Sequence, residues 1–307
     1  MSKRRWPRLA TTLLLGCGLA LAAQAVPPSV ESVRALHQAL GSERYTRDAM
    51  TQIEQQHADS IASAPAEQRA DKAREHEAVS ALLRELMAWP KLEPLAIEAF
   101  RGQLEAGDVV ALRTFLASPA GRLYVDKYTP AVLQGTIESM ALAGERAEMI
   151  SVAVFDDGEL PPPMVAPAAP ETAREKAAAS LVNGFARAQF ELQMAEMNTA
   201  MQDQLRALAP ALGITDQARL QQELDAFASA FREDANFEAY MRPLVAALAT
   251  QLDEDELKRL AQAFAQPGWK ALEGKLDKAN AAFQTALEAD MQQRVLPRLI
   301  EATQVTK

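Results

Sequence analysis

The sequence predicts an all-α protein in which two related helical-bundle modules, each of about six helices, follow one another in tandem. Of its 307 residues, 49% are apolar but only 6% are aromatic, and alanine and leucine dominate the apolar share. Strands favour β-branched and aromatic side chains, so this balance favours helices that pack through small residues. Residues 103–128 also align without a gap with residues 251–276, which lie 148 positions further on. A repeat of this length indicates two copies of one folded module.

The first element along the chain is a predicted secretory signal peptide, Met1–Ala25. Four basic residues precede a short apolar stretch, and Ala23-Gln24-Ala25 matches a cleavage site before Val26. The apolar stretch is too short for a membrane-spanning helix, and no later segment is long and apolar enough to be one. Leu14-Leu15-Gly16-Cys17 also resembles a lipoprotein cleavage box, so an anchor at Cys17 is the alternative. We therefore expect a periplasmic or secreted protein.

The rest of the chain divides at a proline-rich segment. Residues 26–150 form the first predicted module, residues 151–170 the linker and residues 171–307 the second module. The linker prolines cannot continue a helix, so we expect an extended, partly stiff segment there. Apolar periodicity predicts six helices on each side: Val30–Leu40, Glu43–Ile61, Glu67–Met87, Pro90–Leu104, Ala106–Leu116 and Pro119–Gly144, then Glu171–Ala188, Phe190–Leu208, Asp216–Phe231, Phe237–Leu252, Glu254–Phe264 and Pro267–Arg298.

The repeated segment carries the signals of a helical hairpin. Asp253 and Glu256 have the spacing of a capping box at a helix start, and Glu105 and Asp108 hold the same places in the first copy. Ser118-Pro119 then provides an N-cap and a proline at the first helical position, where an N–H has no helical partner anyway. Several equivalent positions hold the same residue: Leu104 and Leu252, Leu112 and Leu260, Pro119 and Pro267, and Lys127 and Lys275.

The segment Phe115-Leu116-Ala117-Ser118-Pro119-Ala120-Gly121 resembles the signature of a family of secreted bacterial helical proteins, the domain of unknown function 2059 family. The family pattern is an acidic helix start followed by Phe-x-x-Ser-Pro-x-Gly, and the resemblance covers the region from Pro94 to Glu138. It implies an all-helical fold and export, and it implies no activity and no catalytic residue.

The motif positions have structural roles in this interpretation: Phe115, Ser118, Pro119 and Gly121, with Pro267 in the second copy. We expect Gly121 to let the two helices of the hairpin approach closely. The second copy departs from the pattern, with Gln266 at the Ser118 position and Trp269 at the Gly121 position. We therefore expect Trp269 to fill its corner, and the second hairpin to splay or to pack differently.

The charge of the chain argues against a nucleic-acid partner. The 32 basic residues of the whole chain, less the four in the signal peptide, stand against 41 acidic residues and leave a net charge of −13 after cleavage. Phosphate binding needs clustered lysine and arginine, which this balance does not favour. We expect the negative charge to keep an exported protein in solution.

Motifs for catalysis or for a cofactor are scarce. Glu54 and His57 share one helix face, as in di-iron bundles, but those sites need a second such pair and two further carboxylates. The alternative for this weak metal-binding pair is a solvated helix face. The sequence contains no His-Glu-x-x-His, no Gly-x-Ser-x-Gly and no phosphate-binding loop. We expect no cofactor, no metal and no essential catalytic group among His37, His57 and His76.

A methionine stripe is the main candidate for binding. Met194, Met197 and Met201 recur at i, i+3 and i+7, and methionine surfaces accept varied apolar partners. The same spacing is typical of any amphipathic helix, so a buried face is the alternative. The function we expect is a non-enzymatic protein- or peptide-binding module. The alternatives are a hydrolase whose catalytic residues are scattered along the chain, and a protein that binds lipid or another apolar ligand.

Overall fold

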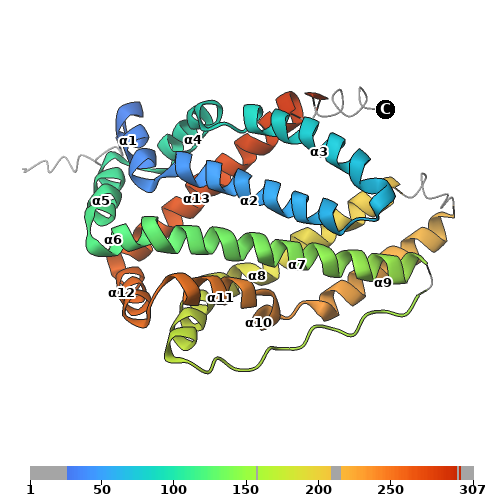
Figure 1. The fold of residues 1–307 in the computed structure, drawn as a ribbon. Coiled ribbons are helices and arrows are strands. Elements are labelled where there is room, and N and C mark those ends of the chain that lie inside the picture. Colours follow the sequence, from blue (N-terminus) through green and yellow to red (C-terminus); the bar gives the residue numbers. More distant parts are fainter. Residues whose placement is uncertain (1–25, 157, 209–215, 296, 299–307) are drawn as a thin grey trace, which may run out of the picture.

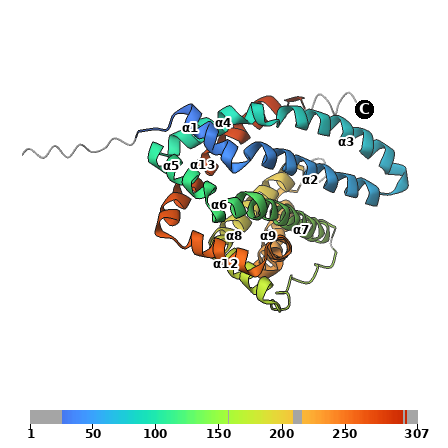
Figure 2. The ribbon, with the colours of Figure 1, turned by 60° about the vertical axis from the view of Figure 1, so that its left-hand side comes forward.

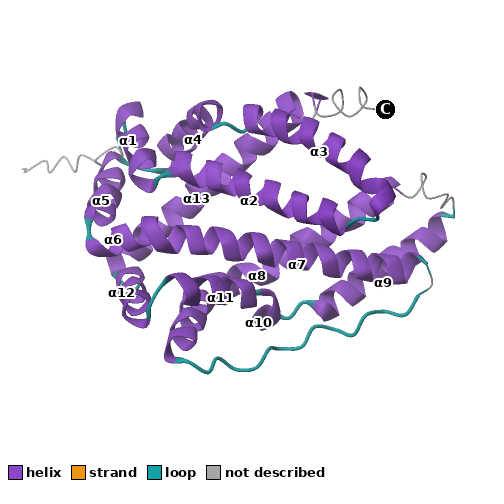
Figure 3. Cartoon of the chain, viewed as in Figure 1, coloured by secondary structure: helices purple, strands orange, loops and turns teal. Residues whose placement is uncertain are grey.

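The computed structural model describes residues 26–156, 158–208, 216–295 and 297–298. Every regular element in these ranges is helical and none is a strand, which confirms the all-α prediction (Figure 3). The first half contains α1 (Val30–Leu40), α2 (Ser42–Ser63), α3 (Ala66–Leu86), α4 (Trp89–Gln103), α5 (Ala106–Ala117), α6 (Pro119–Leu123), the π-helical turn η1 (Tyr124–Tyr128) and α7 (Thr129–Phe155). The second half contains α8 (Ala173–Leu208), α9 (Gln217–Asp234), α10 (Phe237–Tyr240), α11 (Arg242–Gln251), α12 (Glu254–Phe264), α13 (Pro267–Asp290) and the π-helical turn η2 (Met291–Val295).

The two predicted capping boxes are confirmed. At the start of α5 the Glu105 N–H donates to the Asp108 carboxylate at 2.8 Å. At the start of α12 the Glu256 N–H donates to Asp253 Oδ1 at 2.8 Å, and the Asp253 N–H donates to Glu256 Oε2 at 3.0 Å. Such caps satisfy N–H groups that have no helical partner, and each contributes about 1 kcal/mol.

Two helices predicted as separate form one. The sequence predicts a break between Ala188 and Phe190, whereas α8 runs without interruption from Ala173 to Leu208. Only Gln189 lies between the two predicted helices, and glutamine is a good helix former, so no local signal ends the first one. α7 likewise continues beyond the predicted end at Gly144, because Ala147, Ile150 and Ala153 beyond it are buried and bind the helix to the core.

The spacing of 148 residues relates the helices of the two halves, and we call residues at this spacing equivalent. The residues equivalent to Trp89, Ala106 and Pro119 are the first residues of α10, α12 and α13. α4 therefore corresponds to α10 and α11 together, and α5 corresponds to α12. α6, η1 and α7 correspond to α13 and the η2 turn that follows it. The correspondence extends upstream to the last residues of α3 and α9, Leu86 and Asp234.

The last helix of each half packs against the opposite half. α7 packs most extensively against α11, and α13 packs most extensively against α4. Figures 1 and 2 both show α13 extending away from α12 to lie beside α4. The structure does not confirm a tandem arrangement of self-contained modules, because each last helix belongs to a core of the other half.

We call α7 and α13 the exchanged helices, because each packs against the opposite half, and this exchange organises the hydrophobic core. Its larger cluster combines α7 residues, such as Ala131 and Ile150, with α8 to α12 residues, such as Phe227 and Leu248. A second cluster combines residues of α1, α4 and α5 with Ala279 of α13. Ala131 and Ala279 are equivalent, and both are 0% exposed. Each half therefore buries the apolar face of the other half's last helix around a small side chain.

Aromatic side chains fill the junction where the halves cross. The Trp269 ring of α13 lies 4.5 Å from the Phe115 ring of α5 and 5.0 Å from the Phe264 ring of α12. Tyr128 of η1 lies 5.4 Å from Phe264, and Tyr124 stacks on Tyr128 at 5.3 Å. Rings bury large apolar areas, so this cluster joins the exchanged helices to both halves.

A buried polar cluster attaches the extended linker to the bundle. The Asp234 carboxylate is 1% exposed and accepts hydrogen bonds from Arg146, from Tyr240 Oη at 2.8 Å and from the Met164 N–H at 3.0 Å. Arg146 also donates to the Pro162 carbonyl at 2.8 Å. Burial raises the pKa of Asp234, but the hydrogen bonds from Arg146, Tyr240 and Met164 outweigh it and hold that pKa below its ordinary value.

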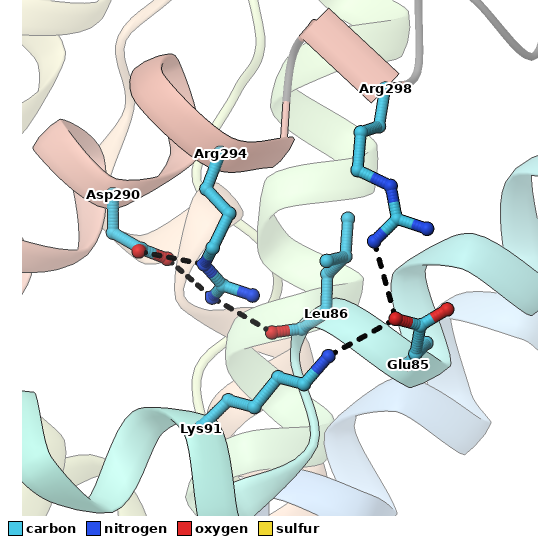
Figure 4. Close-up of polar contacts among 6 residues, drawn as sticks. All are labelled: Glu85, Leu86, Lys91, Asp290, Arg294 and Arg298. Atoms are coloured by element: carbon cyan, nitrogen blue, oxygen red, sulfur yellow. Dashed lines mark hydrogen bonds and ion pairs between the residues drawn. The ribbon is translucent and has the colours of Figure 1, made fainter.

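Figure 4 shows the equivalent place in the other half. Arg294 is equivalent to Arg146 and donates to the carbonyl of Leu86, the residue equivalent to Asp234, at 3.1 Å. Asp290 holds the Arg294 guanidinium at 2.5 Å. In both places an arginine of a last helix, or of the turn that follows it, bonds to the last residue of a helix in the opposite half. The other side chains in Figure 4 form a surface ion-pair group: Glu85, Lys91 and Arg298.

Candidate functional site

The methionine stripe is packed against the core. Met194 is buried, and Met197 and Met201 are half-buried against the larger hydrophobic cluster. Asn198, on the same side of α8, is buried and donates to the Ala228 carbonyl at 3.3 Å. The three methionines therefore lie on a helix face that packs against the core, as the alternative interpretation of the stripe expects.

The glutamate of the weak metal-binding pair takes part in an ion pair between two helices. Glu54 pairs with Arg84 of α3 at 2.5 Å and so connects the α2–α3 hairpin. The side chains of His57 and His76 lie outside the described residues, as do the signal peptide and Cys17. Among the described residues, no three His, Cys, Asp or Glu side chains come together as a metal ion would require.

The motif residues form the tight corner between α5 and α6. Ser118 Oγ accepts from the Gly121 N–H at 3.1 Å, and Pro119 opens α6 as predicted. A Cβ on Gly121 would overlap the backbone of Phe115 and Leu116, which confirms the predicted close approach. At the equivalent corner Pro267 opens α13. These residues shape the fold, and none of them lines the pocket that lies between α2 and α7.

A pocket of about 250 Å³ lies between the first turns of α2 and the start of α7. Gly41 creates it, because its φ of 69° ends α1 and directs α2 across η1 and α7. A left-handed glycine at this position is a common helix terminator. The lining residues come from both sides: Leu40, Gly41, Arg44, Tyr45, Asp48, Thr51, Gln52, Val125, Thr129, Pro130 and Leu133.

The pocket has an apolar wall and a polar rim. Val125, Pro130 and Leu133 form the wall, and Tyr45 beside it is 41% exposed. Arg44 is held in place, since it donates to the Val125 carbonyl of η1 at 2.7 Å. Burial raises the pKa of Tyr45, so its hydroxyl is neutral at physiological pH and can donate a hydrogen bond. π-Helical turns such as η1 are frequent at functional sites.

An apolar strip continues from the pocket along α7. Leu133, Ile137 and Met140 follow one another at i, i+4 and i+7, so they share one helix face. Leu133 is buried in the pocket wall, Ile137 is half-buried and Met140 is 68% exposed. Met140 therefore adds an exposed, flexible apolar side chain at the far end of the strip.

Sequence reasoning did not find this site. Leu133, Ile137 and Met140 are visible in the sequence as a second apolar face, next to the face that contains Ala131 and Gly135. Periodicity alone does not show which of two apolar faces is covered. The pocket also combines residues of α1, α2, η1 and α7, and no local pattern indicates that these segments meet.

The chain was compared with protein-family models, with curated proteins and with solved structures, and none of them matches it. Among the described helices, none combines the length and the hydropathy that crossing a bilayer requires.

Proposed function

We propose that this chain is an exported, non-enzymatic protein that binds a protein or peptide partner, and that the partner inserts an apolar side chain between α2 and α7. The observation that carries the proposal is the pocket with its adjoining apolar strip. Its volume of about 250 Å³ lies below the roughly 300–1,000 Å³ of pockets that enclose a small molecule. A pocket of this volume can hold one or two side chains of a larger partner.

The rim supports recognition of a peptide. Arg44 and Asp48 present opposite charges next to the apolar wall, and Thr51 and Gln52 add polar groups that can bond to a peptide backbone. Interfaces of this kind combine an apolar centre with a polar edge, and a few anchor side chains supply most of the binding free energy. Export rests on the pattern of Met1–Ala25 and on the resemblance of Phe115–Gly121 to secreted helical proteins.

A random-peptide library selected against the purified protein tests the proposal. We expect the selected peptides to share an apolar anchor. Thr51→Trp, which places an indole at the pocket, should weaken their binding by about tenfold or more, the effect of losing one anchor contact. Met140→Gln should weaken it too, because it makes the exposed end of the apolar strip polar.

Matched controls are available elsewhere on the surface. Thr285→Trp replaces another exposed threonine whose hydroxyl, like that of Thr51, donates to the carbonyl four residues earlier. Leu192→Gln changes an apolar side chain that is 61% exposed on α8. Both should leave peptide binding unchanged. Equal affinities for the pocket variants and the controls would overturn the proposal.

A further inference from the structure

The exchanged helices indicate a second kind of partner, which is another copy of this chain. The α4 surface accepts α13 and the α11 surface accepts α7, and α4 and α11 are equivalent, as are α7 and α13. Each half thus packs against the last helix of the other half. Ala279 of α13 and Ala131 of α7 are both fully buried in these contacts.

The linker between α7 and α8 determines whether a first half packs against the second half of its own chain or of another chain. The linker spans residues 156–172, between the end of α7 and the start of α8. The second core cluster, the aromatic junction and the lysine ion pairs between the halves do not involve it. Its own contacts include Met164, which packs against the larger cluster and donates to Asp234, and Pro162, which accepts from Arg146. The helices of a first half would make the same contacts with the second half of another chain as with their own.

We infer that two copies of this chain can form a dimer by exchanging whole halves, so that α13 of each chain lies on α4 of the other. Such exchange is a low-cost route to dimers because it reuses contacts that the monomer already contains. The length of the linker determines whether the chain closes on itself as a monomer or exchanges halves as a dimer.

The linker must be long because it runs back along the bundle. α7 has 27 residues, or about 40 Å of helix at 1.5 Å per residue. The ring of Phe185 in α8 lies 6.2 Å from Tyr128, next to the start of α7, so the chain must return from the far end of α7. Figure 1 shows the linker following this path. An extended linker of this length reaches about 53 Å at 3.1 Å per residue.

Shortening the linker in the full chain tests the inference. Deleting Val165–Pro170 removes six residues after Met164, which is held by Asp234, and lowers the reach of the linker in the polyproline II conformation to about 34 Å, less than the length of α7. A single chain then closes only by straining its linker, so two chains should exchange halves. We expect light scattering after size-exclusion chromatography to show a dimer with unchanged helix content. Replacing Val165–Pro170 by six glycine and serine residues keeps the length and should leave the oligomeric state of the parent protein.

Cross-linking identifies which chain supplies each half. Chains starting at Val26 have no cysteine, so Lys127→Cys and Glu256→Cys can be introduced in separate chains. A short bismaleimide should join a mixture of these chains in the shortened-linker background. It should leave them separate in the folded parent background. Pairing Glu256→Cys with Val110→Cys, at an exposed position on α5, is the control that should give no product.

If the shortened chain does not fold, refolding of chains with the natural linker tests the inference. The two single-cysteine chains with the natural linker are unfolded together and refolded at high protein concentration, and cross-linked pairs of chains should then appear. A shortened chain that folds as a monomer overturns the inference. So does the absence of Lys127→Cys to Glu256→Cys cross-links between chains in both experiments.

Discussion

Lys127 Nζ in η1 lies 2.5 Å from Glu256 Oε1 at the start of α12, and the equivalent lysine, Lys275, lies 2.7 Å from Asp108 at the start of α5. Each lysine belongs to the exchanged end of one half and each carboxylate belongs to a capping box of the other. The two ion pairs therefore connect the halves reciprocally, at positions that the repeat makes equivalent.

The Lys127–Glu256 pair should make a small but measurable contribution to stability. We expect Lys127→Met to lower the free energy of unfolding by about 0.2–1 kcal/mol, because the lysine is partly exposed to solvent. A double-mutant cycle with Glu256→Gln isolates the pair, since glutamine preserves the capping hydrogen bond. Urea unfolding at low and high salt measures it. Coupling that is absent at low salt would contradict the prediction.

Unfolding should be a single transition, although two independent modules joined by a linker would unfold in two. Leu112 and Leu260 are equivalent and buried in different clusters. Leu112→Ala and Leu260→Ala should each lower the free energy of unfolding by roughly 2–5 kcal/mol. Both should shift one common transition, because the exchanged helices couple the clusters. Val110→Ala on exposed α5 surface is the control, and calorimetry showing two transitions that shift separately would contradict the prediction.

Two glycines of α7 should respond in opposite ways to alanine. A Cβ at Gly135 would overlap the backbone of Leu244, so Gly135→Ala must separate α7 from α11, at a cost of about 1–3 kcal/mol or more. No heavy atom lies within 4 Å of a Cβ at Gly144, so Gly144→Ala should stabilise the helix by about 0.5–1 kcal/mol. Thermal unfolding of both variants measures the difference. Equal effects would show that α7 and α11 do not cross as closely as described.

Acid should destabilise the protein through His37. Burial lowers the pKa of His37 to about 4, and the smaller raising effects of the Ala96 backbone and the Glu93 carboxylate do not offset it. The ring lies 4.5 Å from Phe100 and 5.4 Å from Trp89, and its Nδ1 is 3.0 Å from Ser42 Oγ.

In the unfolded chain the pKa of this histidine is about 6.5. Between pH 6.5 and 4 the unfolded state therefore binds more protons than the folded state, so stability falls as the pH falls and levels off below pH 4. The loss due to His37 should reach roughly 3 kcal/mol. Urea unfolding across this range measures it against His37→Gln, which does not titrate there. The same pH slope in both proteins would contradict the prediction.

The mature protein should begin at Val26. Ala23-Gln24-Ala25 matches a cleavage site, and the apolar run continues past Cys17. Intact mass spectrometry of the protein from its native host should give a chain without Cys17 and without a lipid. A lipidated species that begins at Cys17 would show that the lipoprotein alternative is correct.

Local signals predicted the elements well. Asp253, Glu105 and Ser118 begin helices where the sequence places them, because a cap depends on residues only two or three positions away. The break predicted before Phe190 is wrong because periodicity alone was used there, without a residue that ends a helix. The pocket was not predicted, since Tyr45 and Leu133 meet only through the direction that Gly41 gives to α2.

The sequence by itself determined the all-helical class, the capped hairpins and the spacing of 148 residues, because these depend on neighbouring residues and on a repeat that can be read directly. Only the tertiary structure decided that α7 lies on α11 and α13 on α4. Equivalent helices have similar apolar faces, so each last helix could cover its own half or the other without any change in periodicity. The choice depends on side chains far apart in the chain, such as Gly135 against Leu244 and Trp269 against Phe115, which pack together only when the helices are exchanged.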